Sequence, residues 1–194
     1  MSIIEISEYQ IHNNKISSHK INAICLCFCM DLTASQTAKY VGLSRQTINH
    51  YYKIMRAALP QEMVDKPIKS LSVGYMIIQN QAYFYAKQEE NYFYIEMNSS
   101  LFNDLYETYL FPLTHHTKAN CIRLIYNAYT QKYISLGYFR HDLALNDFIS
   151  TRLKKFRGLK KESHALHFKE SILRFNHTQK ELQKMLSLKL GLQN

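Results

Sequence analysis

The stretch from Thr33 to Arg56 carries residue types that read nucleic-acid bases. Ser44 is a favoured helix cap, and the polar side chains after it fall on one face of a helix that starts there. In the major groove of DNA, Arg pairs bidentately with guanine, whereas Gln and Asn pair with adenine. The residues expected to contact DNA here are Ser44, Arg45, Gln46, Asn49, His50, Lys53 and Arg56.

The residues before Ser44 predict the elements that would hold this face, namely a helix-turn-helix. Ala38 is small enough for a helix crossing, and Gly42 suits a corner that needs positive φ. Lys53 and Arg56, with Tyr51 or Tyr52, are expected on phosphates, which position a protein without specifying sequence. The alternative is an ordinary helical hairpin with a solvated polar face. Apolar contacts between the two helices are expected from Val41, Leu43 and Ile48.

A second basic stretch lies near the C-terminus. From position 152 to position 162 there are six basic residues and one acid, which indicates a phosphate-facing strip. The alternative is a solvated helix face. The six residues expected to contact DNA are Arg152, Lys154, Lys155, Arg157, Lys160 and Lys161.

Composition narrows the class of protein. The 194 residues are 46% hydrophobic and carry a formal charge of +9, which favours a folded core and a polyanionic partner. No apolar run approaches the roughly 20 residues of a membrane-spanning helix, and the N-terminus lacks the basic region of a secretory signal. We therefore expect a cytoplasmic, nucleoid-associated protein without a membrane partner. Cys25, Cys27 and Cys29 lack zinc-knuckle spacing and are expected to pack in a helix.

The pattern along the chain predicts an α/β or α+β protein of two domains, residues 1–60 and 68–194. Apolar, β-branched and aromatic runs predict strands, and helical periodicity predicts helices. Expected strands cover 70–79, 82–88, 91–97, 121–127 and 132–139, and expected helices after the first domain cover 99–111, 144–156, 160–176 and 178–192. Most of the 15 tyrosines are expected in the core of the strands rather than on a base-stacking platform.

Most of residues 19–192 resembles the small ISXO-type DDE insertion-sequence transposases of bacteria. The resemblance is specific at both ends, in the predicted helix-turn-helix and in the C-terminal stretch. The matching C-terminal motifs are Thr151-Arg152-Leu153, Lys155-Phe156-Arg157-Gly158, Leu166-His167-Phe168-Lys169-Glu170 and Arg174-Phe175-Asn176-His177. This resemblance implies a reduced RNase-H-like domain that would cut and join DNA with two divalent metals.

The chain departs from that family at its three metal-binding acids. Asn127 stands at the second acid position and Leu143 at the last, and Mg²⁺ sites need clustered carboxylate oxygens. Asp65, Asp142 and Asp147 are the candidate substitutes, although surface acids are the simpler interpretation.

We therefore expect a catalytically inactive transposase relative that binds specific double-stranded DNA and needs no cofactor, with a homodimer left open. One alternative is an active, Mg²⁺-dependent transposase, and another is a decaying gene product without a present function. The pairs His115/His116 and His164/His167 lack a third ligand at useful spacing, so surface or core packing is expected for them.

Overall fold

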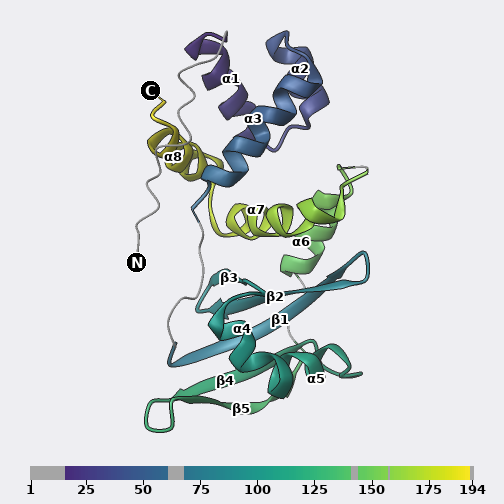
Figure 1. Cartoon of the computed structure of the whole chain (residues 1–194), viewed down its shortest axis with the longest axis vertical. Coiled ribbons are helices and arrows are strands. Elements are labelled where there is room, and N and C mark those ends of the chain that lie inside the picture. Colours follow the sequence, from purple (N-terminus) through teal and green to yellow (C-terminus); the bar gives the residue numbers. More distant parts are fainter. Residues whose placement is uncertain (1–15, 61–67, 141–143, 157, 193–194) are drawn as a thin grey trace. The chain divides into compact units, whose positions relative to one another are not determined.

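The computed structural model describes residues 16–60, 68–140, 144–156 and 158–192, and the chain divides into two units (Figure 1). Unit 1 comprises Met1–Pro60 and His177–Asn194, and unit 2 comprises Gln61–Asn176. The expected domains, 1–60 and 68–194, differ from this division at the C-terminal end. Residues 177–194 belong to the same unit as the first helices.

Unit 1 is helical. Its core combines apolar side chains from both ends of the sequence, including Ile24 and Phe28 near one end and Leu182 and Leu186 near the other, all at most 3% exposed. Capping boxes at Thr33 and Thr178 begin two of its helices. The helices are α1 (Ser18–Cys29), α2 (Ala34–Val41), α3 (Arg45–Ala58) and α8 (Gln179–Leu190).

Unit 2 is built on a five-stranded sheet of order β3-β2-β1-β4-β5. Every neighbouring pair of strands is antiparallel. The expected strands are confirmed, because β-branched and aromatic side chains pack well on a pleated surface. The strands are β1 (Ser70–Ile78), β2 (Gln81–Gln88), β3 (Asn91–Ile95), β4 (Cys121–Asn127) and β5 (Lys132–Phe139).

Helices cover parts of both faces of this sheet, so apolar residues occur at successive strand positions. Phe84 and Ala86 of β2 belong to one core with α4 (Ser100–Leu105), η3 (Tyr106–Leu110) and α5 (Phe111–Thr114). Tyr83 and Tyr85 of the same strand belong to a second core with α6 (Ala144–Leu153) and α7 (His164–Asn176). These burials confirm the expected core role of the strand tyrosines.

The chain is thus an α+β protein, as its antiparallel sheet and separate helices require. The helix expected over 144–156 ends earlier, at Leu153, and a single 3₁₀ turn, η4 (Lys161–Ser163), precedes α7. Among the described residues, no helix is both long enough and apolar enough to cross a bilayer. The four cysteines are buried, which confirms the packing role expected for Cys25, Cys27 and Cys29.

Candidate nucleic-acid interface

The corner between α2 and α3 is fixed by backbone geometry and one side-chain cap. Gly42 has φ 70°, and its N–H donates to the Ala38 carbonyl at 3.0 Å. This left-handed conformation favours glycine. Ser44 then accepts a hydrogen bond from the Thr47 N–H at 3.1 Å and so begins α3. Gly42 and Ser44 thus take the positions that the sequence predicts for them, whereas the helix-crossing role of Ala38 stays a prediction.

Helix α3 has one buried side and one exposed side. Ile48 and Met55 are fully buried. The side chains expected to read bases lie on the exposed side and extend from the capped N-terminus of the helix. The exposed members are Ser44, Arg45, Gln46, Asn49, His50 and Lys53.

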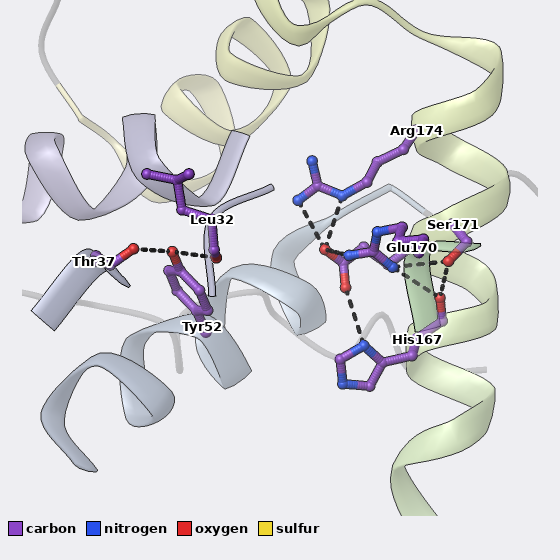
Figure 2. A network of polar contacts seen from close by, with 8 residues as sticks. Leu32, Thr37, Tyr52, His167, Glu170, Ser171 and Arg174 are labelled. Carbon is purple, nitrogen blue, oxygen red and sulfur yellow. Dashed lines mark hydrogen bonds and ion pairs between the residues drawn. The ribbon is translucent and has the colours of Figure 1, made fainter. Parts of the chain in front are cut away.

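Tyr51 and Tyr52 do not lie on that exposed side, so their expected phosphate contacts are wrong. Each is only 2% exposed. The Tyr52 hydroxyl donates to the Leu32 carbonyl at 3.0 Å and contacts the Thr37 hydroxyl at 2.6 Å (Figure 2). Tyr52 therefore joins α3 to the start of α2 inside unit 1.

Arg56 is half-buried rather than free in solvent. Its guanidinium lies 5.6 Å from the ring centroid of Phe28 and 5.7 Å from that of Tyr52, which are cation–π distances. The aromatic core thus positions Arg56, and a phosphate contact would have to use the remaining part of its guanidinium.

Two residues of α2 also have exposed side chains that could contact DNA, although the sequence pattern did not predict them. Lys39 is exposed and Tyr40 is 74% exposed. In helix-turn-helix proteins the first helix crosses the DNA backbone, where such side chains contact phosphates. Their signal was a Lys-Tyr pair just before the corner glycine.

The basic stretch of unit 2 is not a uniform strip. Lys154, Lys155, Lys160 and Lys161 are exposed, as a phosphate contact requires. Arg152 is 3% exposed, so its expected DNA contact is wrong. Its charge is buried because a carboxylate compensates it inside unit 2. Arg157 lies outside the described residues.

Arg152 belongs to a buried polar network between α6 and α7, whose members His167, Glu170, Ser171 and Arg174 are labelled in Figure 2. Its Nη2 lies 2.6 Å from Glu170 Oε1, and its Nη1 donates to the Ser171 hydroxyl at 2.8 Å. Arg174 donates to the same Glu170 oxygen from Nε at 2.9 Å and from Nη2 at 2.8 Å. His167 Nδ1 lies 3.6 Å from the other Glu170 oxygen. The buried carboxylate of Glu170 therefore pairs with two guanidinium groups.

The end of α7 is tied to the sheet by another residue of the C-terminal motifs. Asn176 Oδ1 accepts from the Tyr92 N–H at 3.1 Å, and Asn176 Nδ2 donates to the Tyr92 carbonyl at 2.6 Å. The Phe175 ring packs edge-on against Tyr92 at 5.4 Å. Arg152 and Glu170 thus join α6 to α7, and Asn176 joins the end of α7 to β3.

No protein-family model, curated protein or solved structure matches the chain. The resemblance to transposases therefore stands on its motifs alone.

Of the three candidate metal-binding acids, the structure describes only Asp147. Asp147 is exposed on α6. Asp65, Asp142 and Leu143 lie outside the described residues. Within the described ranges there is no group of three or more His, Cys, Asp or Glu side chains able to hold a metal.

The side chain of Asn127 forms hydrogen bonds within the turn that follows β4. Its Oδ1 accepts hydrogen bonds from the Tyr129 N–H at 2.9 Å and from the Thr130 N–H at 3.2 Å. An Asn side chain that bonds the backbone two residues on stabilises a tight turn. The amide oxygen at this position therefore shapes the β4–β5 hairpin.

The histidine pairs serve packing and local bonding. His115 Nδ1 lies 3.0 Å from the Phe111 carbonyl oxygen, and the His116 ring stacks on Tyr138 at 4.9 Å. His164 and His167 are buried, at 3% and 7% exposed. These positions confirm the expected surface and core roles.

Proposed function

We propose that this chain binds specific double-stranded DNA through α3, and that Lys39 and Tyr40 of α2 contact phosphates of the adjacent DNA backbone. The observation that carries the proposal is the division of α3 into a buried apolar side and an exposed side bearing Arg45, Gln46 and Asn49. These three side chains supply the donor and acceptor patterns that distinguish bases in the major groove. The formal charge of +9 adds the sequence-independent attraction to phosphates.

We further propose that unit 2 is a reduced, catalytically inactive relative of the RNase-H-like domain of DDE transposases. The turn-forming role of Asn127 supports this, since its amide oxygen is engaged where the family carries an acid. The α6–α7 network supports it as well, because the residues that carry the resemblance are those that hold the layer together. The exposed lysines of the C-terminal basic stretch, Lys154, Lys155, Lys160 and Lys161, then contribute phosphate contacts only.

Selection from a pool of random duplexes tests the DNA-binding proposal. We expect the full chain to enrich a common sequence, and we expect the double variant Arg45→Ala/Asn49→Ala to lose that enrichment while still retaining duplexes at low salt. A pool that stays random through repeated rounds with the unaltered chain would contradict specific binding.

A further inference from the structure

A hollow of about 610 Å³ lies on one face of the sheet in unit 2. On this face α6 and α7 pack over the tyrosines of β2 and β3. The hollow lies on the same face, against β1, β2, β4 and β5. Its lining includes Ser70, Ser72, Lys87, Arg123 and Phe139.

Strand register explains why this place is both hollow and basic. Ser72 of β1 is paired with Lys87 on one side and with Arg123 on the other, and Arg123 is paired with Gly137 of β5. Directly paired residues point to the same face, so these four form one row across four strands. Strands lie about 4.8 Å apart, which places the Lys87 and Arg123 backbones about 10 Å apart with Ser72 between them. Two long cationic side chains thus flank the small side chain of Ser72.

The charges of the hollow are poorly neutralised. Lys69, Lys87 and Arg123 line it, against the single carboxylate of Glu89. Lys87 Nζ lies 3.8 Å from Glu90, but that carboxylate side chain is 96% exposed, and such surface pairs contribute little. Among the described residues no ion pair engages Lys69 or Arg123.

Phe139, on one wall of the hollow, positions the guanidinium of Arg123. The Arg123 guanidinium lies 5.3 Å from the centroid of the Phe139 ring. This cation–π contact restricts the position of the guanidinium, whose N–H donors are suited to phosphate oxygens. Ser70 and Ser72 also line the hollow, and their hydroxyls are further donors.

We propose that this basic hollow binds the phosphodiester backbone of a DNA strand. The guanidinium, ammonium and hydroxyl donors that line the hollow match phosphate oxygens, and Arg is suited to bidentate phosphate contacts. The site adds a contact that is separate from the α3 face of unit 1, and it does not depend on sequence-specific reading.

The test uses the full chain in the Arg45→Ala/Asn49→Ala background, so that base reading by α3 is removed. Binding of a labelled random-sequence duplex is measured by fluorescence anisotropy over a range of salt concentrations. Adding Lys87→Ala and Arg123→Ala is expected to weaken binding about tenfold or more and to reduce the salt slope by about 2, since each lost phosphate contact removes about 0.9. The control is Lys118→Ala, which removes an exposed unit 2 lysine outside the hollow and should leave the salt slope unchanged.

Two further measurements separate the competing explanations. Arg123→Lys keeps the charge and is expected to restore most of the binding lost in Arg123→Ala, whereas a misfolded sheet would not be rescued. In NMR spectra of the full chain, the duplex should change the amide chemical shifts of Ser70, Ser72 and Gly137. Inorganic phosphate should change these shifts only at much higher concentration. An unchanged affinity and salt slope in the Lys87/Arg123 variant would overturn the proposal, and so would equal binding of inorganic phosphate. If the unaltered chain showed no sequence preference while Lys87→Ala and Arg123→Ala still reduced the salt slope, only the assignment of base reading to α3 would be contradicted.

Discussion

Arg152 and Glu170 form a buried ion pair of 2.6 Å, although they come from different helices of unit 2. Their side chains are 3% and 1% exposed. Removing one partner of a buried pair leaves an uncompensated charge, which is far more destabilising than the loss of a surface pair. This relationship removes Arg152 from the DNA-facing set and gives it a structural role.

We predict that Glu170→Ala lowers the free energy of unfolding by about 3–5 kcal/mol, because the guanidiniums of Arg152 and Arg174 would then be buried without their anion. Urea denaturation followed by circular dichroism measures the change. Glu162→Ala removes an exposed carboxylate just before α7 and should stay within about 0.5 kcal/mol of the unaltered chain. Equal stability of the two variants would show that the network contributes nothing.

Tyr52→Phe should destabilise unit 1 by about 1–3 kcal/mol, because the buried Thr37 hydroxyl and the Leu32 carbonyl each lose a hydrogen-bond partner. Tyr40→Phe is the matched control, since that tyrosine is 74% exposed. Chemical denaturation of both variants provides the comparison. A Tyr52→Phe chain as stable as the control would refute the bridging role of this hydroxyl.

Leu186→Ala should affect the other helices of unit 1, because Leu186 of α8 is fully buried in that unit. Truncation of a buried leucine costs about 2–5 kcal/mol. We expect faster hydrogen exchange in α1 and α3 but not in β1–β5. The control is Leu188→Ala on the same helix, where the side chain is 76% exposed. Faster exchange confined to unit 2 would contradict the assignment of α8 to unit 1.

Stability should fall in alkaline solution. Burial raises the pKa of the Tyr94 hydroxyl from its ordinary 10.0 to about 12, with Glu96 and Tyr83 adding to the effect. The folded chain therefore holds a proton that the unfolded chain releases, so this contribution is complete below pH 10 and is lost as the pH rises to about 12. Burial likewise raises the pKa of Cys121 from 9.0 to about 12.

Urea denaturation between pH 9 and 12 measures that loss, and Tyr94→Phe should make the pH dependence shallower. Tyr129→Phe, at a tyrosine that is 96% exposed, should leave the dependence unchanged. The same slope in all three chains would mean that Tyr94 does not hold its proton more tightly in the folded state.

Local patterns were sufficient to predict most elements of the fold. Ser44 and Gly42 mark the boundaries of α3 and α2 because capping and positive φ are properties of individual residues. The alternation of Tyr83, Phe84 and Tyr85 did not reveal which face each would take, since helices cover both faces and all three are buried. The sequence likewise could not show that α8 belongs to unit 1, because helical periodicity indicates an apolar side but not its partner.

The residues of the candidate sites also divide into those that local sequence could predict and those that depend on contacts between elements. The exposed face of α3 follows from spacing within a single helix, so its residues could be predicted. The burial of Arg152 depends on Glu170 in another helix, and the hollow depends on the register of Ser72 with Lys87 and Arg123. Pairings between elements are set by tertiary packing, which no single stretch of sequence encodes.

The ratio of affinities for a selected duplex and a random duplex tests the central claim most directly. We predict that Arg45→Ala or Asn49→Ala lowers this ratio about 5- to 150-fold, corresponding to about 1–3 kcal/mol of lost base discrimination. Lys160→Ala should weaken both duplexes equally and reduce the salt slope by about 1. Equal losses on both duplexes after Arg45→Ala would contradict base reading by α3.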